Sequence, residues 1–486
     1  MIYKLRPYQE ECVKSISDYI NSDRHDPVLV IGPVGCGKSI LIAEAARLMG
    51  DKTLVLQPSR ELLIQNHDKI TSYGIPAAIY SASCGKKELS NMIYATLGSI
   101  KKVVGQLKEM GIRNVLIDEA HAGYSPEDGS EFMTFMNELK PKKVIGFTAT
   151  PCRLKTMSIG QVSYSQLNFI TRMRPVYFKN LIHVIQVEEM IRQGFWTPLK
   201  YETWDFNGDA LKLNSNGSEY TAESISEAVR KNGLNNLILR RLMVLKDVCR
   251  SILVFMDSVE SCNTAAEWMN AKICAGMAEV VHGGTPKRQR EAIVERFKSG
   301  GTQVVFNYSA LGTGFDHPGL DCVIVGRPTF SFSSFYQWLG RAVRIKDGKD
   351  SALVVDCCNN SSRFGDIRKL SIENYKGYGW GMFIGDKLIT NIPMGDKVTK
   401  TDLDIKAAKK DRRRGLAQGV TAAPVPGRPD HPLGSTVMTF GKYCGWMLHS
   451  IPVSYFKFIN ETFDWDNDRN KDIKEYIDFL IKNNRL

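Results

Sequence analysis

The sequence predicts an α/β protein with two parallel-sheet domains in tandem and a small C-terminal module. Two series of short β-branched or aliphatic runs alternate with longer helix-like stretches, one before residue 150 and one starting near Ser251. Continuous apolar runs between helices are typical of parallel strands that are covered on both faces. The length of 486 residues agrees with about two to four domains, since a domain usually takes ~100–200 residues.

The composition is that of a folded globular protein. Hydrophobic residues make up 43% and charged residues 24%, which excludes a wholly disordered chain, a collagen-like fibre and a coiled coil. No run approaches the ~20 apolar residues that cross a bilayer, and the first ten residues lack the apolar core of a signal peptide. We therefore expect a cytoplasmic protein without a membrane partner.

The charge and the cysteines add weaker information. Lys and Arg total 64 against 52 Asp and Glu, so the net charge is +12, which suits a polyanionic partner without establishing one. The 11 cysteines include no Cys-x-x-Cys pair, which argues against a zinc ribbon.

The strand-like runs set the expected domain boundaries. We place the first domain at residues 1–175, a connecting segment at 176–250 and the second domain at 251–370. The runs expected to form the first sheet are Val28–Ile31, Thr53–Leu56, Val115–Ile117 and Val144–Phe147. Those expected to form the second are Ile252–Phe255, Val304–Phe306, Val323–Val325 and Leu353–Val355.

The α/β pattern weakens after about Leu370. We expect a hairpin and a basic flexible linker over residues 371–432, because Tyr375–Ile392 is rich in Gly and aromatics and Lys400–Pro432 combines a basic run with repeated Pro and Gly. Aromatic residues return in the last part of the chain, where we expect a small α+β module at 433–486. Its rings either stack on unpaired bases or simply form the core of a very small fold.

A phosphate-binding loop is the strongest motif. Gly32-Pro-Val-Gly-Cys-Gly37-Lys38-Ser39 fits the P-loop (Walker A) pattern and lies between a strand-like run and a helix-like run, as that motif requires. The glycines allow backbone N–H groups to surround phosphates, and the helix N-terminus adds a positive end. We expect Lys38 to reach the β- and γ-phosphates and Ser39 to bind Mg²⁺.

Two carboxylates follow another strand of the same sheet. In Asp118-Glu119-Ala120-His121 they come directly after Val115–Ile117, and so lie at the carboxyl edge of the sheet beside the phosphate loop. We expect Asp118 to hold Mg²⁺ through water and Glu119 to orient and deprotonate the attacking water. Thr148 and Thr150, at the exit of the next strand, can relay hydrogen bonds from this pocket to another surface.

The second domain carries an arginine pair. Arg341 and Arg344 lie three residues apart on an expected helix, and hence on one face of it. Guanidinium groups stabilise charge on a γ-phosphate during transfer, and the first domain supplies every other part of such a site. We therefore assign both arginines to the same nucleotide.

Together these residues resemble the motif set of the superfamily 2 helicases and translocases over roughly residues 1–370. The resemblance implies two RecA-like domains with an ATP site in the cleft between them. Leu5-Arg6-Pro7-Tyr8-Gln9 looks like the adenine-recognition segment, Gln57–Leu62 like motif Ia and Ala95–Ser99 like motif Ic. Gly312–Asp316 and Gln337–Arg344 complete the set in the second domain.

The site residues that these grounds imply fall into four groups. The expected nucleotide-binding residues are Gln9, Gly32, Gly35, Gly37, Lys38, Ser39, Asp118, Gly312 and Asp316. The expected catalytic residues are Lys38, Glu119, Gln337, Arg341 and Arg344. Ser39 and Asp118 are the expected Mg²⁺ ligands, and Arg60, Thr96 and Thr313 the expected nucleic-acid contacts.

Within the superfamily four stretches of the chain look closest to the RadD-like helicases of DNA repair and recombination: Gln65–Lys69, Tyr73-Gly74, Ser81-Ala82 and Leu353–Arg363. Compact phage-encoded helicases are also similar. It differs from the RadD-like branch in having a DEAH box, where DECH is frequent, and no cysteine-rich C-terminal region. The resemblance implies an ATP- and Mg²⁺-dependent DNA helicase or translocase in the cytoplasm of a bacterium or phage-infected cell. Its DNA would be single-stranded, forked or branched, with a replication or recombination protein as a candidate partner.

Two alternatives stay open. One is an RNA-dependent ATPase, and the other is an ATP-switched DNA clamp that does not unwind. The complete catalytic set disfavours an inactive scaffold.

Overall fold

The computed structural model describes residues 4–159, 162–311, 315–407, 431–439, 443, 446–462 and 470–483. The chain divides into two compact units, which are described separately. The first comprises residues 1–374 and 380–398, and the second comprises residues 375–379 and 399–486. The expected linker falls largely on residues 408–430, which lie outside the described part of the chain.

The first lobe of the first unit is built on an eight-stranded sheet in the order β10-β1-β7-β6-β2-β5-β3-β4. All its strand pairs are parallel except β3 with β4. The strands are β1 (Val28–Ile31), β2 (Thr53–Leu56), β3 (Ala78–Ser81), β4 (Lys86–Lys87), β5 (Met92–Ala95), β6 (Asn114–Ile117), β7 (Lys143–Thr148) and β10 (Asn180–Val184).

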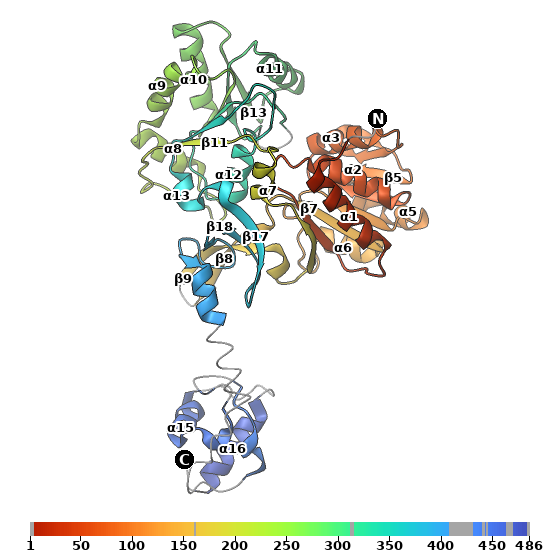
Figure 1. Cartoon of the computed structure of the whole chain (residues 1–486), viewed down its shortest axis with the longest axis vertical. Helices are drawn as coiled ribbons and strands as arrows, with labels where there is room; N and C mark the ends of the chain where they lie inside the picture. The colour runs from red at the N-terminus through yellow and green to blue at the C-terminus, as the bar shows by residue number, and fades with distance from the viewer. Residues whose placement is uncertain are drawn as a thin grey trace. The chain divides into compact units, whose positions relative to one another are not determined.

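Helices cover both faces of this sheet (Figure 1). Val28 and Val30 of β1 point to one face and pack with α1 (Pro7–Asn21), α2 (Lys38–Met49) and α3 (Arg60–Thr71). Leu29 points to the opposite face, which is covered by α5 (Val104–Glu109) and α6 (Glu131–Leu139). Burial on both faces explains why β1 is apolar at every position.

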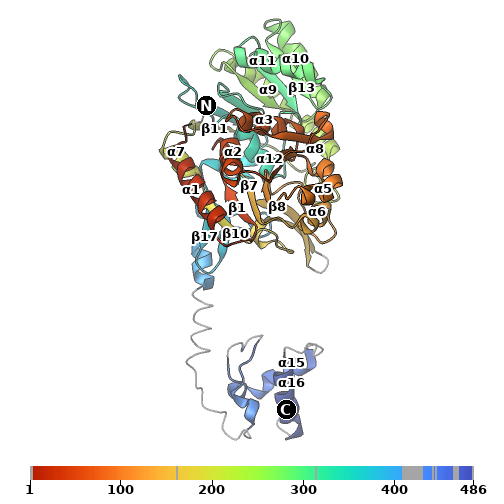
Figure 2. The ribbon, with the colours of Figure 1, turned by 90° about the vertical axis from the view of Figure 1, so that its right-hand side faces the viewer.

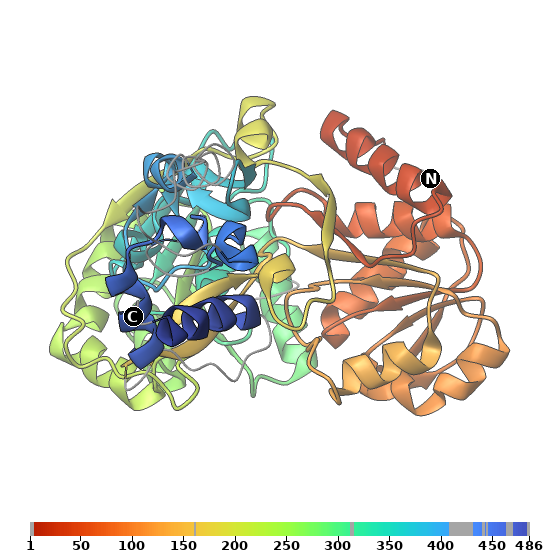
Figure 3. The same ribbon diagram turned by 90° about the horizontal axis from the view of Figure 1, so that it is seen from below.

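The second lobe is built on a six-stranded, entirely parallel sheet in the order β11-β16-β15-β12-β14-β13. Its strands are β11 (Leu199–Thr203), β12 (Ile252–Phe255), β13 (Ala278–His282), β14 (Val304–Tyr308), β15 (Cys322–Val325) and β16 (Ala352–Asp356). Helices α8 (Ala222–Lys231), α9 (Leu234–Leu245) and α10 (Val259–Lys272) cover one face, and α11 (Lys287–Ser299) and α12 (Phe332–Leu339) the other. Figure 3 shows the lobes side by side, the first in red and orange and the second in green and cyan.

The predicted fold class, two tandem parallel-sheet domains, is confirmed. The eight strand-like runs all form strands, whereas several strands were not expected from the sequence. Two of these lie in the segment assigned as a connection: β10 pairs with β1, and β11 pairs with β16. The connecting segment therefore supplies an edge strand to each sheet. Such strands have partly exposed residues, and their sequences lack the continuous apolar run that marks a central strand.

Smaller elements complete the first unit. A long antiparallel hairpin, β8 (Cys152–Ile159) with β9 (Val162–Phe169), follows the last central strand of the first lobe. A four-stranded sheet consists of β17 (Leu370–Tyr375), β18 (Gly379–Ile384), β19 (Lys387–Leu388) and β20 (Val398–Thr399). The short helices are α4 (Leu97–Ile100), α7 (Val187–Arg192) and α13 (Asn360–Phe364), with single 3₁₀ turns at Ala82–Cys84, Lys101–Val103, Ile170–Arg172 and Ile367–Lys369.

The described part of the second unit contains α15 (Val453–Thr462) and α16 (Lys471–Lys482), which are blue in Figure 2. Two 3₁₀ turns, Pro432–Ser435 and Leu448–Ser450, pack with them around a separate apolar core. Among the described helices of both units, none is long and apolar enough to cross a membrane.

Gly146 allows a test of how tightly the first lobe is packed. A Cβ atom there would lie 2.8 Å from both Ala120 and Phe178, and 2.9 Å from Leu29. Overpacking of this kind costs ~1–3 kcal/mol, so Gly146→Ala should lower the midpoint of urea unfolding. Gly98→Ala is the matched control, because Gly98 lies in α4 with nothing near its missing Cβ. Equal midpoints for the two variants would contradict the packing.

Candidate functional site

The loop between β1 and α2 has a backbone that needs glycine. Gly35 has a φ of +82° and Gly37 a φ of +79°, both in the left-handed region that other residues rarely adopt. A Cβ atom on Gly37 would also lie 2.5 Å from Nε2 of the Gln9 side chain. Lys38 begins α2 directly after this turn, so the loop presents backbone N–H groups and the positive end of a helix to one point.

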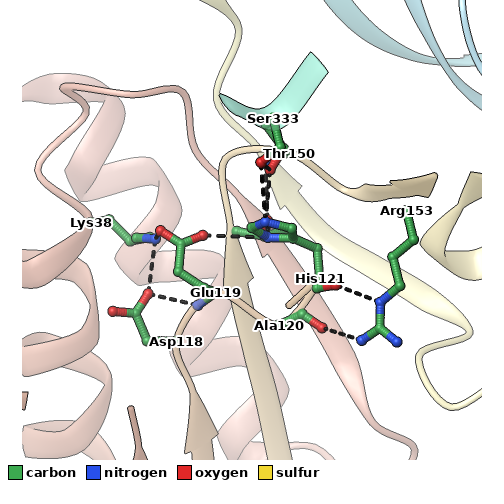
Figure 4. Close-up of polar contacts among 9 residues, drawn as sticks. Lys38, Asp118, Glu119, Ala120, His121, Thr150, Arg153 and Ser333 are labelled. Carbon is green, nitrogen blue, oxygen red and sulfur yellow. Dashed lines mark hydrogen bonds and ion pairs between the residues drawn. The ribbon is translucent and has the colours of Figure 1, made fainter. Parts of the chain in front are cut away.

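Lys38 lies between the two carboxylates that the sequence predicted (Figure 4). Its Nζ is 2.9 Å from Oδ1 of Asp118 and forms a second ion pair with Glu119. Asp118 also accepts hydrogen bonds from the backbone N–H of Glu119 (2.8 Å) and from Nδ2 of Asn66 (3.0 Å). The structure therefore brings together residues from α2 and from the end of β6.

Burial and charge shift the pKa values of this group in opposite directions. Burial alone would lower the pKa of Lys38, but the two carboxylates raise it above its ordinary value. Burial raises the pKa of the Asp118 carboxyl, and the ammonium of Lys38 opposes that shift. Lys38 is thus a permanent cation whose natural partners are anionic oxygens.

A cavity of about 340 Å³ adjoins these residues and is lined by both lobes. Its first-lobe lining includes the predicted residues Gly32, Gly35, Gly37, Lys38, Ser39, Asp118 and Glu119. Its second-lobe lining includes Asp316, Gln337, Arg341 and Arg344. A hydroxyl and a carboxylate are oxygen ligands that suit Mg²⁺, which commonly takes one or two protein ligands besides phosphate and water, so Ser39 and Asp118 fit that ion.

The arginine pair does not lie on a helix as expected. Helix α12 ends at Leu339, and the next residues form a tighter turn in which the N–H of Arg341 bonds to the carbonyl of Trp338 (3.2 Å). Both guanidinium groups nevertheless reach the cavity. Nη1 of Arg341 donates to the carbonyl of Phe315 (2.6 Å), and Arg344 forms an ion pair with Asp316. Burial lowers the pKa of each arginine to about 10, which leaves both charged at neutral pH.

Gln9 lies behind the phosphate loop and is not among the cavity residues. It is buried, with its Oε1 accepting from the N–H of Arg6 (2.9 Å) and its Nε2 donating to the carbonyl of Cys36 (2.8 Å). In this arrangement Gln9 supports the loop, and its reading of adenine stays a prediction. Gly312 and Thr313 fall outside the described residues.

Sequence reasoning missed the segment Phe195-Trp196-Thr197. Phe195 lines the cavity, and the guanidinium of Arg6 lies over its ring, 4.6 Å from the centroid. Nε1 of Trp196 donates to the carbonyl of Val34 in the phosphate loop (2.8 Å), and Oγ1 of Thr197 donates to the carbonyl of Arg344 (2.7 Å). The segment thus connects the two halves of the cavity. Adjacent aromatics in a segment without motifs were the only signal for it.

A chain of polar contacts runs from Glu119 to the second lobe (Figure 4), and its links from His121 to Ser333 are hydrogen bonds. Oε2 of Glu119 lies 3.4 Å from Nδ1 of His121, whose Nε2 is 3.1 Å from the hydroxyl of Thr150. That hydroxyl is also 3.1 Å from Oγ of Ser333 on α12. Nδ1 of His121 lies 2.8 Å from the hydroxyl of Thr148. The relay expected of Thr148 and Thr150 is therefore present in the geometry, and Ser333 is a member that the sequence did not indicate.

Arg153, at the base of the β8–β9 hairpin, holds the turn that carries Glu119. Its guanidinium donates to the carbonyls of His121 and Tyr124, the latter at 2.6 Å. Glu119 has a φ of +46°, an unusual conformation that needs such support. The far half of the hairpin contacts the loop before α8, where Thr156 donates to the carbonyl of Asn216 (3.0 Å).

The expected nucleic-acid contacts lie at the carboxyl edge of the first sheet. Arg60 begins α3, which follows β2, and Thr96 follows the neighbouring strand β5. Thr96 belongs to a cluster of hydroxyls, 3.1 Å from Oγ of Ser81 and 3.2 Å from Oγ of Ser99. These positions agree with a strand path across the sheet edge, although their role stays a prediction.

Two family models match the chain. The model for the res subunit of type III restriction enzymes matches residues 2–153, and the model for the helicase conserved C-terminal domain matches residues 235–346. The first match contains the phosphate loop and both carboxylates. The second contains both cavity arginines.

Curated proteins of similar sequence include a yeast protein and a phage protein. The putative ATP-dependent helicase IRC3 of Saccharomyces cerevisiae is 23% identical over 378 residues, which is 74% of this chain and 52% of IRC3. The 51.5 kDa protein of Lactococcus phage (isolate 7-9) is 24% identical over 332 residues, which is 68% of this chain and 65% of that protein. The alignments thus span about half to two thirds of these relatives.

Solved structures share the fold at low identity. The type ISP restriction-modification enzyme LlaBIII bound to DNA has a TM-score of 0.54 at 15% identity, covering 86% of this chain and 30% of that one. A variant of Saccharomyces cerevisiae Dbp5 bound to RNA and ADP BeF3 has a TM-score of 0.50 at 15% identity, covering 84% of this chain and 93% of that one.

The burial of His121 predicts an acid-dependent loss of stability. Burial, together with the charges of Lys38 and Arg153, lowers the pKa of His121 to about 3. The unfolded chain therefore binds a proton near pH 6.5 that the folded chain does not bind. Above pH 6.5 His121 is neutral in both states and does not lower the free energy of unfolding. Between pH 6.5 and pH 3 only the unfolded chain gains the proton, so the free energy of unfolding falls by up to about 1.4 kcal/mol per pH unit.

His121→Gln should accordingly lose less stability between pH 7 and pH 5 than the unmodified chain, as measured by urea unfolding. His25→Gln, at an exposed histidine, is the control and should follow the unmodified chain. The same acid sensitivity in all three proteins would show that His121 is not held neutral.

The contacts of Arg153 predict an effect on turnover. Arg153→Met removes the donors that hold the Glu119 turn, so kcat for ATP hydrolysis should fall by about one to two orders of magnitude with little change in KM. Lys155→Met, at an exposed position of the same strand, should leave kcat unchanged. A rise in KM at constant kcat would place Arg153 in nucleotide binding instead.

Proposed function

We propose, from the premise that this chain belongs to the superfamily 2 helicases, that it is an ATP-dependent DNA helicase or translocase. The observation that carries the proposal is the cavity with Lys38, Asp118 and Glu119 on one side and Arg341 and Arg344 on the other. A nucleotide held by both lobes makes their closure depend on its γ-phosphate. Binding then closes the lobes, and hydrolysis releases them.

Each side chain has a defined task in this proposal. Lys38 and the loop N–H groups bind the β- and γ-phosphates, in place of the carboxylates that Lys38 contacts in the free protein. Ser39 and Asp118 hold Mg²⁺, which would neutralise phosphate charge. Glu119 takes a proton from the attacking water, and Arg341 and Arg344 stabilise the charge that develops on the transferred phosphoryl group.

The relay through His121 offers a route by which hydrolysis is coupled to movement. Glu119 and Ser333 lie at its two ends, and Ser333 lies on the helix that precedes both arginines. A change in the position or protonation of Glu119 would therefore reach the second lobe through two neutral groups, the imidazole of His121 and the hydroxyl of Thr150. No charge would have to move across the cleft. We also propose that Gln337, which lines the cavity, contributes to ATP hydrolysis.

DNA is the proposed track. A net charge of +12 favours a polyanion, and the match of residues 2–153 to the model for the res subunit of type III restriction enzymes favours DNA over RNA. We propose repair, recombination or replication as the process. RNA as the track is an outcome of the test below, and so is a clamp that hydrolyses ATP without moving.

The test compares ATP turnover on different nucleic acids. Single-stranded and forked DNA should raise kcat, and the salt dependence of binding should be steep, because phosphate contacts release counterions. Arg341→Ala should lower the stimulated kcat by about 10³-fold or more, while Arg240→Ala, on an exposed arginine of α9, should leave it unchanged. Lys38→Ala should abolish turnover, and Glu119→Gln should retain nucleotide binding without turnover.

Each alternative has its own outcome. Stimulation by RNA with DNA inert would replace the DNA assignment. Stimulated turnover without displacement of a labelled strand or a roadblock protein from DNA would indicate the clamp. Normal turnover in Lys38→Ala would overturn the site itself.

A further inference from the structure

One lysine holds the backbone of the two cavity arginines. Residues 340–343 form a turn after the end of α12, so the carbonyls that follow the helix need donors from elsewhere. Nζ of Lys349 donates to the carbonyls of Ala342 (2.7 Å) and Arg344 (2.9 Å). It also donates to the carbonyl of Pro318 (3.1 Å). An ammonium group has three N–H donors, and Lys349 directs all three to backbone carbonyls.

The carbonyls that Lys349 contacts belong to two segments that meet at the cavity. Pro318 lies two residues after Asp316, whose carboxylate pairs with the guanidinium of Arg344. Lys349 therefore ties the backbone of an arginine to the segment that carries its carboxylate partner. Pro318 and Arg344 both line the cavity, whereas Lys349 is not among the described residues that do so. It acts on the site through the backbone of residues that line it.

Thr197 donates to the same backbone. Its N–H bonds to the carbonyl of Val343 (2.8 Å), and its Oγ1 donates to the carbonyl of Arg344 (2.7 Å). Together with the bond from Lys349 to Ala342, three consecutive carbonyls thus accept from donors outside the turn. The donors from Lys349 are charged, and hydrogen bonds from a charged donor are roughly twice as strong as neutral ones. Lys349 is therefore the stronger of the two supports.

We propose that Lys349 is a positioning residue for ATP hydrolysis, which fixes the guanidinium groups of Arg341 and Arg344 by holding the backbone between them. The inference rests on the proposed function and adds a residue that acts without touching the nucleotide. A displacement of about 1 Å in a group that stabilises transition-state charge can lower a rate by about 10²-fold. Lys38 and the loop N–H groups would still bind the phosphates, so loss of Lys349 should act on kcat rather than on KM.

The surroundings of this ammonium make it sensitive to alkali. Burial lowers the pKa of Lys349 to about 8, because the Asp321 carboxylate only partly opposes burial and the positive charges of Arg344 and Lys346. His317 also faces it, but the pKa of His317 is lowered to about 4, so that ring is neutral here. Above pH 8 Lys349 loses its charge and one N–H donor. The two arginines, each with a pKa of about 10, are still charged at that point.

The experiment measures kcat and KM for ATP with the full chain and saturating single-stranded DNA, from pH 7 to about 9.5. In the unmodified chain kcat should fall as the pH rises through 8. Lys349→Met should lower kcat at pH 7 by about one to two orders of magnitude, with little change in KM and no further fall in alkali. Lys349→Arg keeps its charge over the whole range, so it should retain more activity than Lys349→Met and also lose the alkaline fall.

Lys346→Met is the matched control, since Lys346 is an exposed lysine of the same segment. It should keep kcat at pH 7, and its alkaline fall should remain but move to higher pH, because Lys349 loses a positive neighbour. A purely structural lysine would change the unfolding midpoint without changing the pH profile of kcat.

Three results would contradict the inference. Equal kcat values for Lys349→Met and the unmodified chain, or the same alkaline fall in both, would remove the positioning role and leave the proposed function intact. A kcat that stays constant from pH 7 to about 9.5 in the unmodified chain would do the same without any substitution. Absence of ATP turnover in the unmodified chain, with DNA and with RNA, would overturn the proposed function and the role of Lys349 with it.

Discussion

The position of one ammonium group organises the first lobe of this protein. Lys38 lies at the start of α2, and its charge is balanced by Asp118 and Glu119 at the end of β6, two strands away in the sheet from the strand that leads into its own loop. A largely buried cation of this kind, with its side chain 18% exposed, is stable only with anionic oxygens beside it. The arrangement of the loop and the carboxylates therefore depends on which oxygens Lys38 contacts, those of the protein or those of a phosphate.

The same charge balance extends across the cleft. Arg341 and Arg344 are partly buried cations, and in the free protein their guanidinium groups contact the carbonyl of Phe315 and the carboxylate of Asp316. Each side of the cavity thus supplies its own counter-charges. A triphosphate would compete for the cations of both sides at once, which is a physical reason for the lobes to close on it.

The contacts between the lobes that adjoin the nucleotide cavity lie close to the residues with proposed catalytic roles. Trp196 bonds to the phosphate loop, Thr197 to the backbone of Arg344, and Ser333 to the Thr150 hydroxyl. Gly340 packs so closely on Val34 that a Cβ atom there would lie 2.5 Å from its side chain. A small movement of the phosphate loop therefore displaces the turn that carries the arginines, because close-packed contacts transmit displacement.

Local sequence by itself determined the parts whose chemistry is contained within a few residues. The left-handed glycines of the phosphate loop, the carboxylates at the end of β6 and the apolar central strands are each set by short-range sterics and burial, so the fold class and most of the nucleotide site could be predicted. Tertiary structure alone decided which distant residues join them. Phe195, Arg153 and Ser333 carry no motif, and they reach the site because edge strands, a hairpin and α12 pack where they do. It also decided that α12 ends at Leu339, so that both arginines lie in the turn and the segment that follow the helix. Such outcomes depend on the competition of many side chains for the same buried volume, which the order of residues along the chain does not reveal.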